Sequence, residues 1–92
     1  MIGLHDQVVT NDDVLSTDVD GDVVMMDVDS GNYFGLDAIS SDIWHRLARP
    51  VTVEALCDDL LRDYDAPLDV IRRDVLALLN TLHDKKLVRT VA

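Results

Sequence analysis

The stretch from Asp18 to Asp37, DVDGDVVMMDVDSGNYFGLD, decides the fold because turn signals separate runs of alternating residues. Asp20-Gly21 is typical of a two-residue hairpin turn, which needs positive φ at both central positions. A tight turn here pairs Val19 with Asp22 and thereby sets the register of the hairpin. We therefore predict a three-stranded antiparallel meander with strands near residues 14–19, 22–28 and 32–36.

The second turn decides which side of the meander is apolar. A three-residue loop, Asp29-Ser30-Gly31, with Gly31 in the left-handed region pairs Val28 with Asn32. We prefer this loop to a two-residue loop because it buries more apolar surface. The predicted apolar face then consists of Leu15, Thr17, Val19, Val24, Met26, Val28, Phe34 and Leu36.

Helical spacing replaces the strand period after Leu36. Asp37 is a candidate N-cap for a helix that ends at Pro50, and Thr52 is a candidate N-cap for a second helix. Pro67 begins the third and longest helix, over about residues 67–86, and residues 87–91 are a candidate terminal strand. The predicted fold class is α+β, winged helix-turn-helix-like, with a three-stranded antiparallel meander followed by three helices.

The length of 92 residues leaves room for one domain. We expect residues 1–13 to be an N-terminal arm or a frayed first strand and residues 14–92 to be the domain. No apolar run approaches the roughly 20 residues that span a bilayer, and no secretory leader opens the chain. One cysteine cannot form an internal disulfide, so we expect a cytoplasmic protein that is not in a membrane.

Charge is distributed unevenly along the chain. The net charge is -10, and residues 1–42 contain ten Asp and no Lys or Arg. Proteins that bind nucleic acid normally show a basic surface, so we expect no nucleic-acid partner. A winged-helix DNA-binding protein is kept as an alternative because the last helix carries Arg72 and Arg73.

Residues that could carry chemistry stand in unsuitable contexts. A calcium-loop spacing is present, but Val23 stands where the loop requires Gly; its candidate ligands are Asp18, Asp20, Asp22 and Asp29. The three histidines are far apart, and Cys57 has no Cys or His at ligand spacing. Ser30 lies in a hairpin, whereas the modified serine of a carrier protein begins a helix. We therefore predict no catalytic residue, no metal and no cofactor at these positions.

An unprotected strand edge is the strongest functional feature. The strand from Asn32 to Leu36 carries no Lys or Pro that would block pairing with another chain. An extended peptide can add to such an edge as a fourth strand, unless the last helix or the C-terminal segment covers it. Leu76 lies away from the main apolar stripe of the last helix. It is either an exposed leucine or, with Arg72, Leu79 and His83, the second wall of a groove.

The chain resembles the PqqD family of peptide-recognition proteins over about residues 14–88. The resemblance rests on MMDVDSGNYFGLDAISSDIWHRLARPVTVEALCDDLLRDYD, residues 25–65, followed by APLDVIRRDVLALLNTLHDKKLV, residues 66–88. Its most specific part is the turn and strand from Ser30 to Asp37, followed by Ile43-Trp44 and the TVEAL helix. Members of the family are winged-helix-like domains without catalysis of their own, so the resemblance implies that this chain is not an enzyme.

The resemblance implies a RiPP recognition element, which binds the leader segment of a ribosomally made precursor peptide as an added strand. The peptide-binding residues expected from it are Asn32, Tyr33, Phe34, Gly35, Leu36, Arg72, Leu76, Leu79 and His83. The implied partners are a precursor leader peptide and a leader peptidase or other maturation enzyme, as in lasso-peptide biosynthesis. A peptide chaperone for a radical SAM enzyme is the alternative within the family. We expect a monomer or a weak homodimer.

Overall fold

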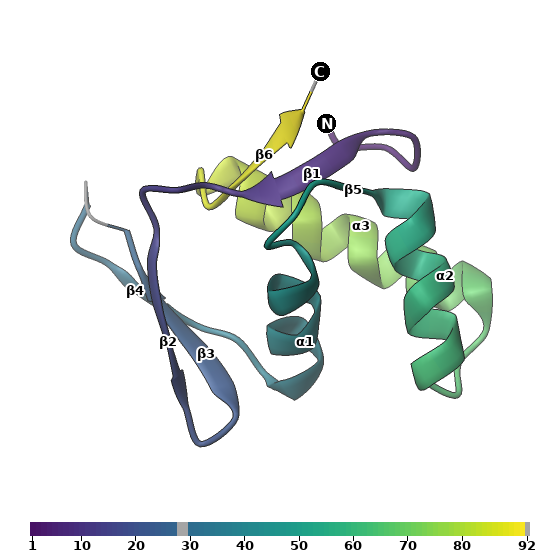
Figure 1. Cartoon of the computed structure of the whole chain (residues 1–92), viewed down its shortest axis with the longest axis horizontal. Coiled ribbons are helices and arrows are strands. Elements are labelled where there is room, and N and C mark those ends of the chain that lie inside the picture. The colour runs from purple at the N-terminus through teal and green to yellow at the C-terminus, as the bar shows by residue number, and fades with distance from the viewer. Residues whose placement is uncertain (28–29, 92) are drawn as a thin grey trace.

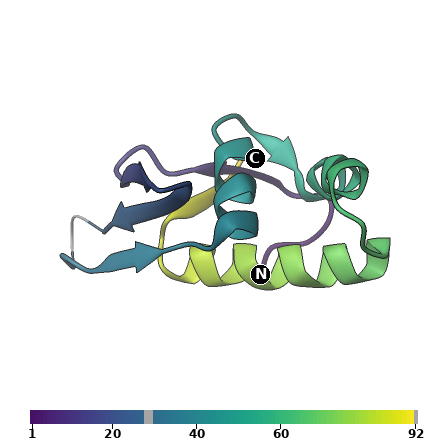
Figure 2. The same cartoon turned by 90° about the horizontal axis from the view of Figure 1, so that it is seen from below.

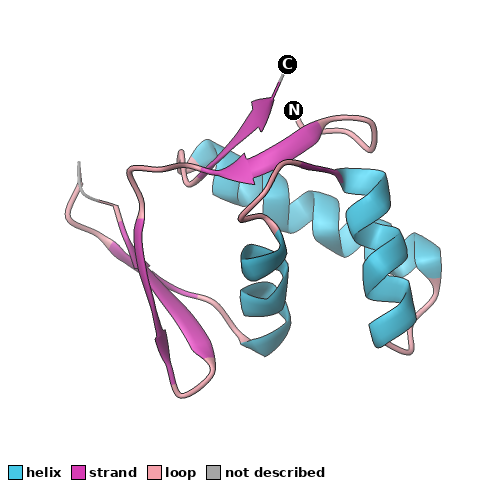
Figure 3. Cartoon of the chain, in the orientation of Figure 1, coloured by secondary structure: helices cyan, strands magenta, loops and turns pink. Residues whose placement is uncertain are grey.

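The computed structural model describes residues 1–27 and 30–91, which form two small antiparallel sheets and three helices (Figure 1, Figure 3). The first sheet has the order β5-β1-β6, with β5 Val51–Thr52, β1 Gln7–Thr10 and β6 Val88–Val91. The second has the order β2-β3-β4, with β2 Leu15–Val19, β3 Asp22–Met26 and β4 Tyr33–Gly35. The helices are α1 Ala38–Arg46, α2 Val53–Asp63 and α3 Leu68–Asp84. The predicted α+β fold, with its meander and three helices, is confirmed.

The first hairpin forms as its turn residues predict. Asp20 has a φ of 53° and Gly21 a φ of 89°, the two positive values that a type I′ turn needs. Val19 stands opposite Asp22, which confirms the predicted register. At the end of this hairpin, the Asp18 carboxylate lies 3.0 Å from Nε2 of His45, and this contact ties β2 to α1.

The register between β3 and β4 differs from the prediction by one residue. Phe34 stands opposite Met25, and Tyr33 opposite Met26, whereas the predicted loop placed Phe34 opposite Met26. Gly31 has the predicted positive φ, at 72°. Val28 and Asp29, on which the predicted loop depended, lie outside the described residues. The predicted pairing is wrong, and a slip of one residue turns every side chain of β4 to the other face.

The buried face of the meander is consequently the opposite of the predicted one. Val23 and Met25 are buried, at 1% and 0% exposure, whereas Leu15 and Val19 are exposed. The cause is that β3 is apolar on both faces, so alternation alone does not select one. The selection is made by α1, which packs against β3 and receives the side of Val23 and Met25.

The N-terminal segment, predicted as an arm or a frayed first strand, contributes β1, the central strand of the first sheet. Val8 is fully buried there, and β1 pairs with β6 along its whole length. Ile2 is also buried, and its backbone N–H donates to Oδ1 of Asn80 in α3 over 2.8 Å. The pairing of β1 with β6 joins segments near the two ends of the chain. Local sequence pattern gives no sign of such a partner.

The helices begin at their predicted caps. The Asp37 carboxylate accepts the Ser40 N–H over 2.8 Å, and Oγ1 of Thr52 accepts the Ala55 N–H over 3.2 Å. Helix α3 runs along one side of the molecule beneath α1 and the first sheet (Figure 2). No helix within residues 1–27 and 30–91 is long and apolar enough to cross a membrane.

Candidate functional site

The outer edge of β4 offers backbone groups for pairing. In the described part of the chain, β4 is hydrogen-bonded as a strand to β3 alone, because β6 belongs to the other sheet. The Leu36 N–H donates to the Val23 carbonyl over 2.9 Å, and Asn32 O accepts from the Asp27 N–H over 2.9 Å. Bonded pairs alternate along an antiparallel ladder, so the N–H and C=O groups of Tyr33 and Gly35 point away from β3.

Ser41 fixes the position of β4 relative to α1. It is the one polar residue among the described residues with a buried side chain, at 1% exposure. Its Oγ accepts the Val23 N–H over 2.8 Å and donates to the Leu36 carbonyl over 3.2 Å. The hydroxyl thus continues the β3–β4 ladder where the chain leaves the sheet to begin α1. Ser41 therefore anchors the inner side of β4 to α1.

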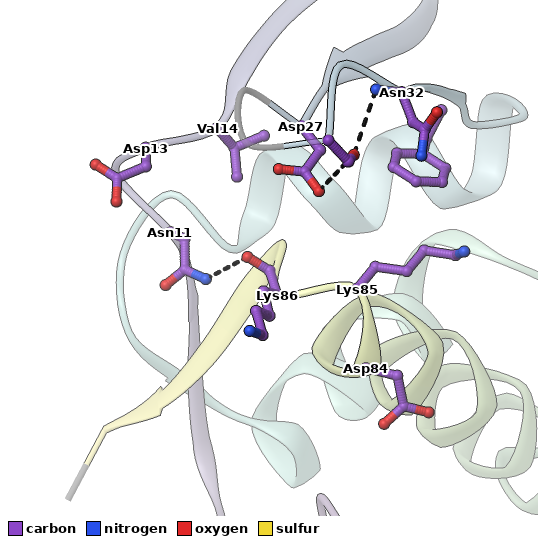
Figure 4. Close-up of a pocket in the computed structure, with 10 residues that line it drawn as sticks. Asn11, Asp13, Val14, Asp27, Asn32, Asp84, Lys85 and Lys86 are labelled. Carbon is purple, nitrogen blue, oxygen red and sulfur yellow. Dashed lines mark hydrogen bonds between the residues drawn. The ribbon is translucent and has the colours of Figure 1, made fainter.

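A polar cavity of about 600 Å³ lies where β4 approaches the end of α3 (Figure 4). Phe34 of β4 and the preceding Asn32 line one side of it, and Asp84, Lys85 and Lys86 line it from the end of α3 and the residues that follow. Nζ of Lys85 stands 4.6 Å from the centre of the Phe34 ring. This cation–π contact spans the groove between β4 and α3, into which the cavity opens. The cavity therefore combines an aromatic surface with charges of both signs.

A more apolar hollow of about 300 Å³ lies at the other end of β4, where α1, α2 and α3 meet. Ile39 and Ile43 of α1 line one side of it. Val75 and Leu78 of α3 line another. Tyr64 closes it near α2, and its hydroxyl donates to the Asp42 carboxylate over 2.7 Å. An apolar side chain fits this hollow best.

The structure places the strand and helix parts of the predicted site differently. The strand residues Asn32, Tyr33, Phe34, Gly35 and Leu36 all lie on or beside the open edge. The helix residues Arg72, Leu76, Leu79 and His83 line neither the polar cavity nor the apolar hollow.

The surroundings of α3 explain this placement. Leu79 is fully buried in the core. Next to Leu76, the Asn80 side chain is bonded to the backbone of Ile2, so this side of α3 faces the N-terminal segment. The side that lines the apolar hollow is turned by about 170° from it, at about 100° per residue. Binding by the four predicted helix residues stays a prediction.

Two contributors to the groove were absent from the predicted site. Leu78 lines the apolar hollow, and Lys85 stands over Phe34. Both follow Ile71 at helical spacing on one side of α3, a signal present in the sequence. Nothing local showed which side of α3 faces β4, because that depends on how the two sheets flank the helix.

The electrostatics of the groove come from few groups. The Ser40 N–H and hydroxyl bonds hold the pKa of the Asp37 carboxyl below its usual value, so α1 begins with a negative charge beside the apolar hollow. Among residues 1–27 and 30–91, no three His, Cys, Asp or Glu side chains gather as a metal site would require. The open edge of β4 can form hydrogen bonds with the backbone of an extended peptide, and the cavity and the hollow can receive side chains of that peptide.

Comparison with known proteins adds a family and two solved structures. Residues 22–88 match the family described as coenzyme PQQ synthesis protein D (PqqD). The chain is similar to TbiB1, solved in complex with the TbiA(beta) leader peptide. The two sequences are 32% identical, and the structures match with a TM-score of 0.82 over 91% of this chain and 98% of that chain. Lasso peptide synthetase B1 complexed with the leader peptide is 21% identical, with a TM-score of 0.79 over 89% and 96%, and shows the same fold. No curated protein matches the chain.

Proposed function

Because the chain belongs to the PqqD family, we propose that it recognises the leader segment of a ribosomally made precursor peptide by adding it as a strand to β4. The observation that carries the proposal is the open edge of β4, where the N–H and C=O groups of Tyr33 and Gly35 point outward. TbiB1, which aligns over nearly its whole length, is itself bound to a leader peptide. Backbone bonds would supply affinity, and flanking side chains would supply selectivity.

The groove supports a division of labour along the bound peptide. At one end of β4, the apolar hollow would receive an aliphatic or aromatic side chain against Ile43 and Leu78. At the other end, Phe34 and Lys85 would flank the peptide with a flat, positively charged surface. Asn32 and Leu36 would lie at the two ends of the segment that pairs with the peptide. In this proposal Leu78 and Lys85 join the strand residues in place of the fully buried Leu79.

We place the chain in the lasso-peptide branch and propose a leader peptidase as the enzyme that it serves. A non-catalytic module would accelerate processing by holding the cleavage region of the precursor near the active site of that enzyme. The same groove would suit a peptide chaperone for a radical SAM enzyme, the alternative branch. The proposed location is the cytoplasm, where ribosomal precursors are made.

The winged-helix DNA-binding alternative loses support from the surroundings of α3. Nε of Arg72 is buried, and Arg73 lies 3.5 Å from the Asp74 carboxylate. The Arg73 side chain is 73% exposed, but Asp69 and Asp74 on the same helix and the net charge of -10 oppose the phosphate contacts that dominate affinity for DNA. We retain peptide recognition as the proposed function.

A proline at the open edge tests strand addition directly. Gly35→Pro removes an N–H that points away from β3, so it costs the free protein no ladder bond, and proline is tolerated on strand edges. We expect leader affinity to fall about 10- to 100-fold through loss of a backbone bond and obstruction of the incoming strand. Calorimetric titration with a synthetic leader peptide measures the change.

The matched control is Ser16→Pro, which places the same residue on the outer edge of β2, on the far side of the sheet. This variant should bind the leader as the unchanged chain does, and circular dichroism should show both variants folded. Equal affinity of a folded Gly35→Pro variant would contradict strand addition at β4.

A further inference from the structure

The face of the second sheet that points away from α1 is largely apolar and uncovered. It carries Leu15 at 58%, Val19 at 51% and Tyr33 at 71% exposure, with Val24 and Met26 half-buried between them. These five residues, here called the outer face, come from all three strands of the sheet. Leu15, Val24, Met26 and Tyr33 border a shallow hollow of about 210 Å³.

No described element of the chain covers the outer face. Helix α1 packs on the opposite face of β3, against Val23 and Met25. Both ends of the chain belong to the first sheet, at a distance from β2 (Figure 1). Clustered exposed apolar side chains on a small protein are typical of an interaction surface, whereas isolated ones are ordinary.

Charge around the outer face restricts what can cover it. All three strands lie within residues 1–42, which contain ten Asp and no Lys or Arg. Asp20 and Asp22 stand exposed at the hairpin end, and Asp13 stands exposed before β2. A second copy of this chain would bring equal sets of carboxylates together, and an anionic lipid surface would be repelled as well. A complementary partner has an apolar centre bordered by Lys and Arg.

The outer face adjoins the proposed peptide site through Tyr33. Its side chain belongs to the outer face, while its backbone N–H and C=O lie on the open edge of β4. A protein seated on the outer face would therefore lie beside a peptide that leaves this edge. This position suits an enzyme that acts on the bound precursor.

We propose that the outer face is the docking surface for the processing enzyme, which meets it with an apolar patch bordered by basic residues. The proposal rests on the proposed function, since that function supplies the shared peptide. Leu15 is the residue on which to test it, because β2 is separated from the peptide edge by β3. Its exposure means that its replacement empties no core space.

The experiment compares Leu15→Glu with Leu61→Glu, the same change at an exposed leucine of α2. The probe is the purified leader peptidase that cleaves the cognate precursor, titrated against each chain with and without synthetic leader. We expect Leu15→Glu to weaken the affinity for the peptidase about tenfold or more, as loss of a central apolar contact does. Leu61→Glu should leave it unchanged. Added salt should weaken binding of the unchanged chain.

Separate readouts keep the two proposals apart. Leader affinity, measured on each chain alone, should be the same for both variants and the unchanged chain. Absence of leader binding in all three would overturn the proposed function, whereas an effect on peptidase affinity confined to Leu15→Glu would still support the docking surface. Equal peptidase affinities of the folded variants would overturn the docking surface. So would a homodimer in sedimentation that Leu15→Glu dissociates, since a second copy would then be the occupant.

Discussion

The two sheets of this protein use their surfaces in different ways. In the β5-β1-β6 sheet, the central strand carries the fully buried Val8, and Val88 of β6 is 1% exposed. In the β2-β3-β4 sheet, every residue of β2 is exposed, and only β3 contributes fully buried side chains. The first sheet pairs segments from both ends of the chain, whereas the second is built from one continuous segment.

This difference separates stability from binding. A sheet that joins distant segments needs extensive burial of its side chains, because ordering those segments costs loop entropy. A meander of consecutive strands orders at lower entropic cost and can leave one face and one edge open. The second sheet therefore provides the open edge of β4 and the outer face, while the first sheet, the helices and the inner face of β3 provide the core. Substitutions should affect stability in one sheet and binding in the other.

Matched charge insertions should give the largest contrast. Val8→Asp buries a carboxylate where the native side chain has no exposure, which should destabilise the fold by more than about 4 kcal/mol and leave little folded protein. Val24→Asp makes the same change on the outer face and should cost about 1 kcal/mol. Urea unfolding followed by circular dichroism measures both. Similar losses in the two variants would remove the distinction between the sheets.

Removal of the Ser41 hydroxyl should have an intermediate effect, because it attaches the second sheet to α1. Ser41→Ala leaves the buried Val23 N–H without its acceptor and the Leu36 carbonyl without its donor. We expect a loss of about 2 kcal/mol in the free energy of unfolding. Ser16→Ala, at an exposed position of β2, is the control and should be nearly neutral. A neutral Ser41→Ala variant would mean that the attachment relies on packing alone.

The same contrast between local and distant contacts explains what the sequence could predict. Asp20-Gly21, Asp37 and Thr52 act through neighbours within three residues, and each forms the predicted turn or cap. The pairing of β1 with β6 was absent from the prediction, because it joins residues at opposite ends of the chain.

The candidate site divides in the same way. The open edge from Asn32 to Leu36 was predicted from its composition, and the structure leaves it unpaired on its outer side within the described residues. The pairing of Phe34 was misplaced by one residue, because β3 offers apolar side chains on both faces. The periodicity of α3 predicted an apolar stripe, but Leu78 and Lys85 could be assigned to the groove only once β4 had been placed beside the helix.

The smallest predicted effect concerns the polar contacts between α1 and the end of α2. Asp42 of α1 accepts hydrogen bonds from Arg46 over 3.0 Å and from the Tyr64 hydroxyl over 2.7 Å, and Arg46 also pairs with Asp63. The bond from Arg46 holds the pKa of the Asp42 carboxyl below its ordinary value of 3.8, outweighing partial burial, and the Tyr64 hydroxyl lowers it further.

A carboxyl whose pKa is lower in the folded state stabilises the fold above its unfolded pKa, and this contribution is lost as the pH falls through the folded value. Asp42→Asn should therefore reduce the free energy of unfolding at pH 7 by less than about 1 kcal/mol, because the pair is partly exposed. The difference from the unchanged chain should shrink as the pH falls below 3.8. Asp59→Asn, which breaks the more exposed pair with Arg62, is the control and should change stability less at either pH. Urea midpoints at pH 7 and at about pH 2 measure the effect. A difference that persists unchanged in acid would show that Asp42 acts through hydrogen bonding that Asn cannot reproduce, with no contribution from its charge.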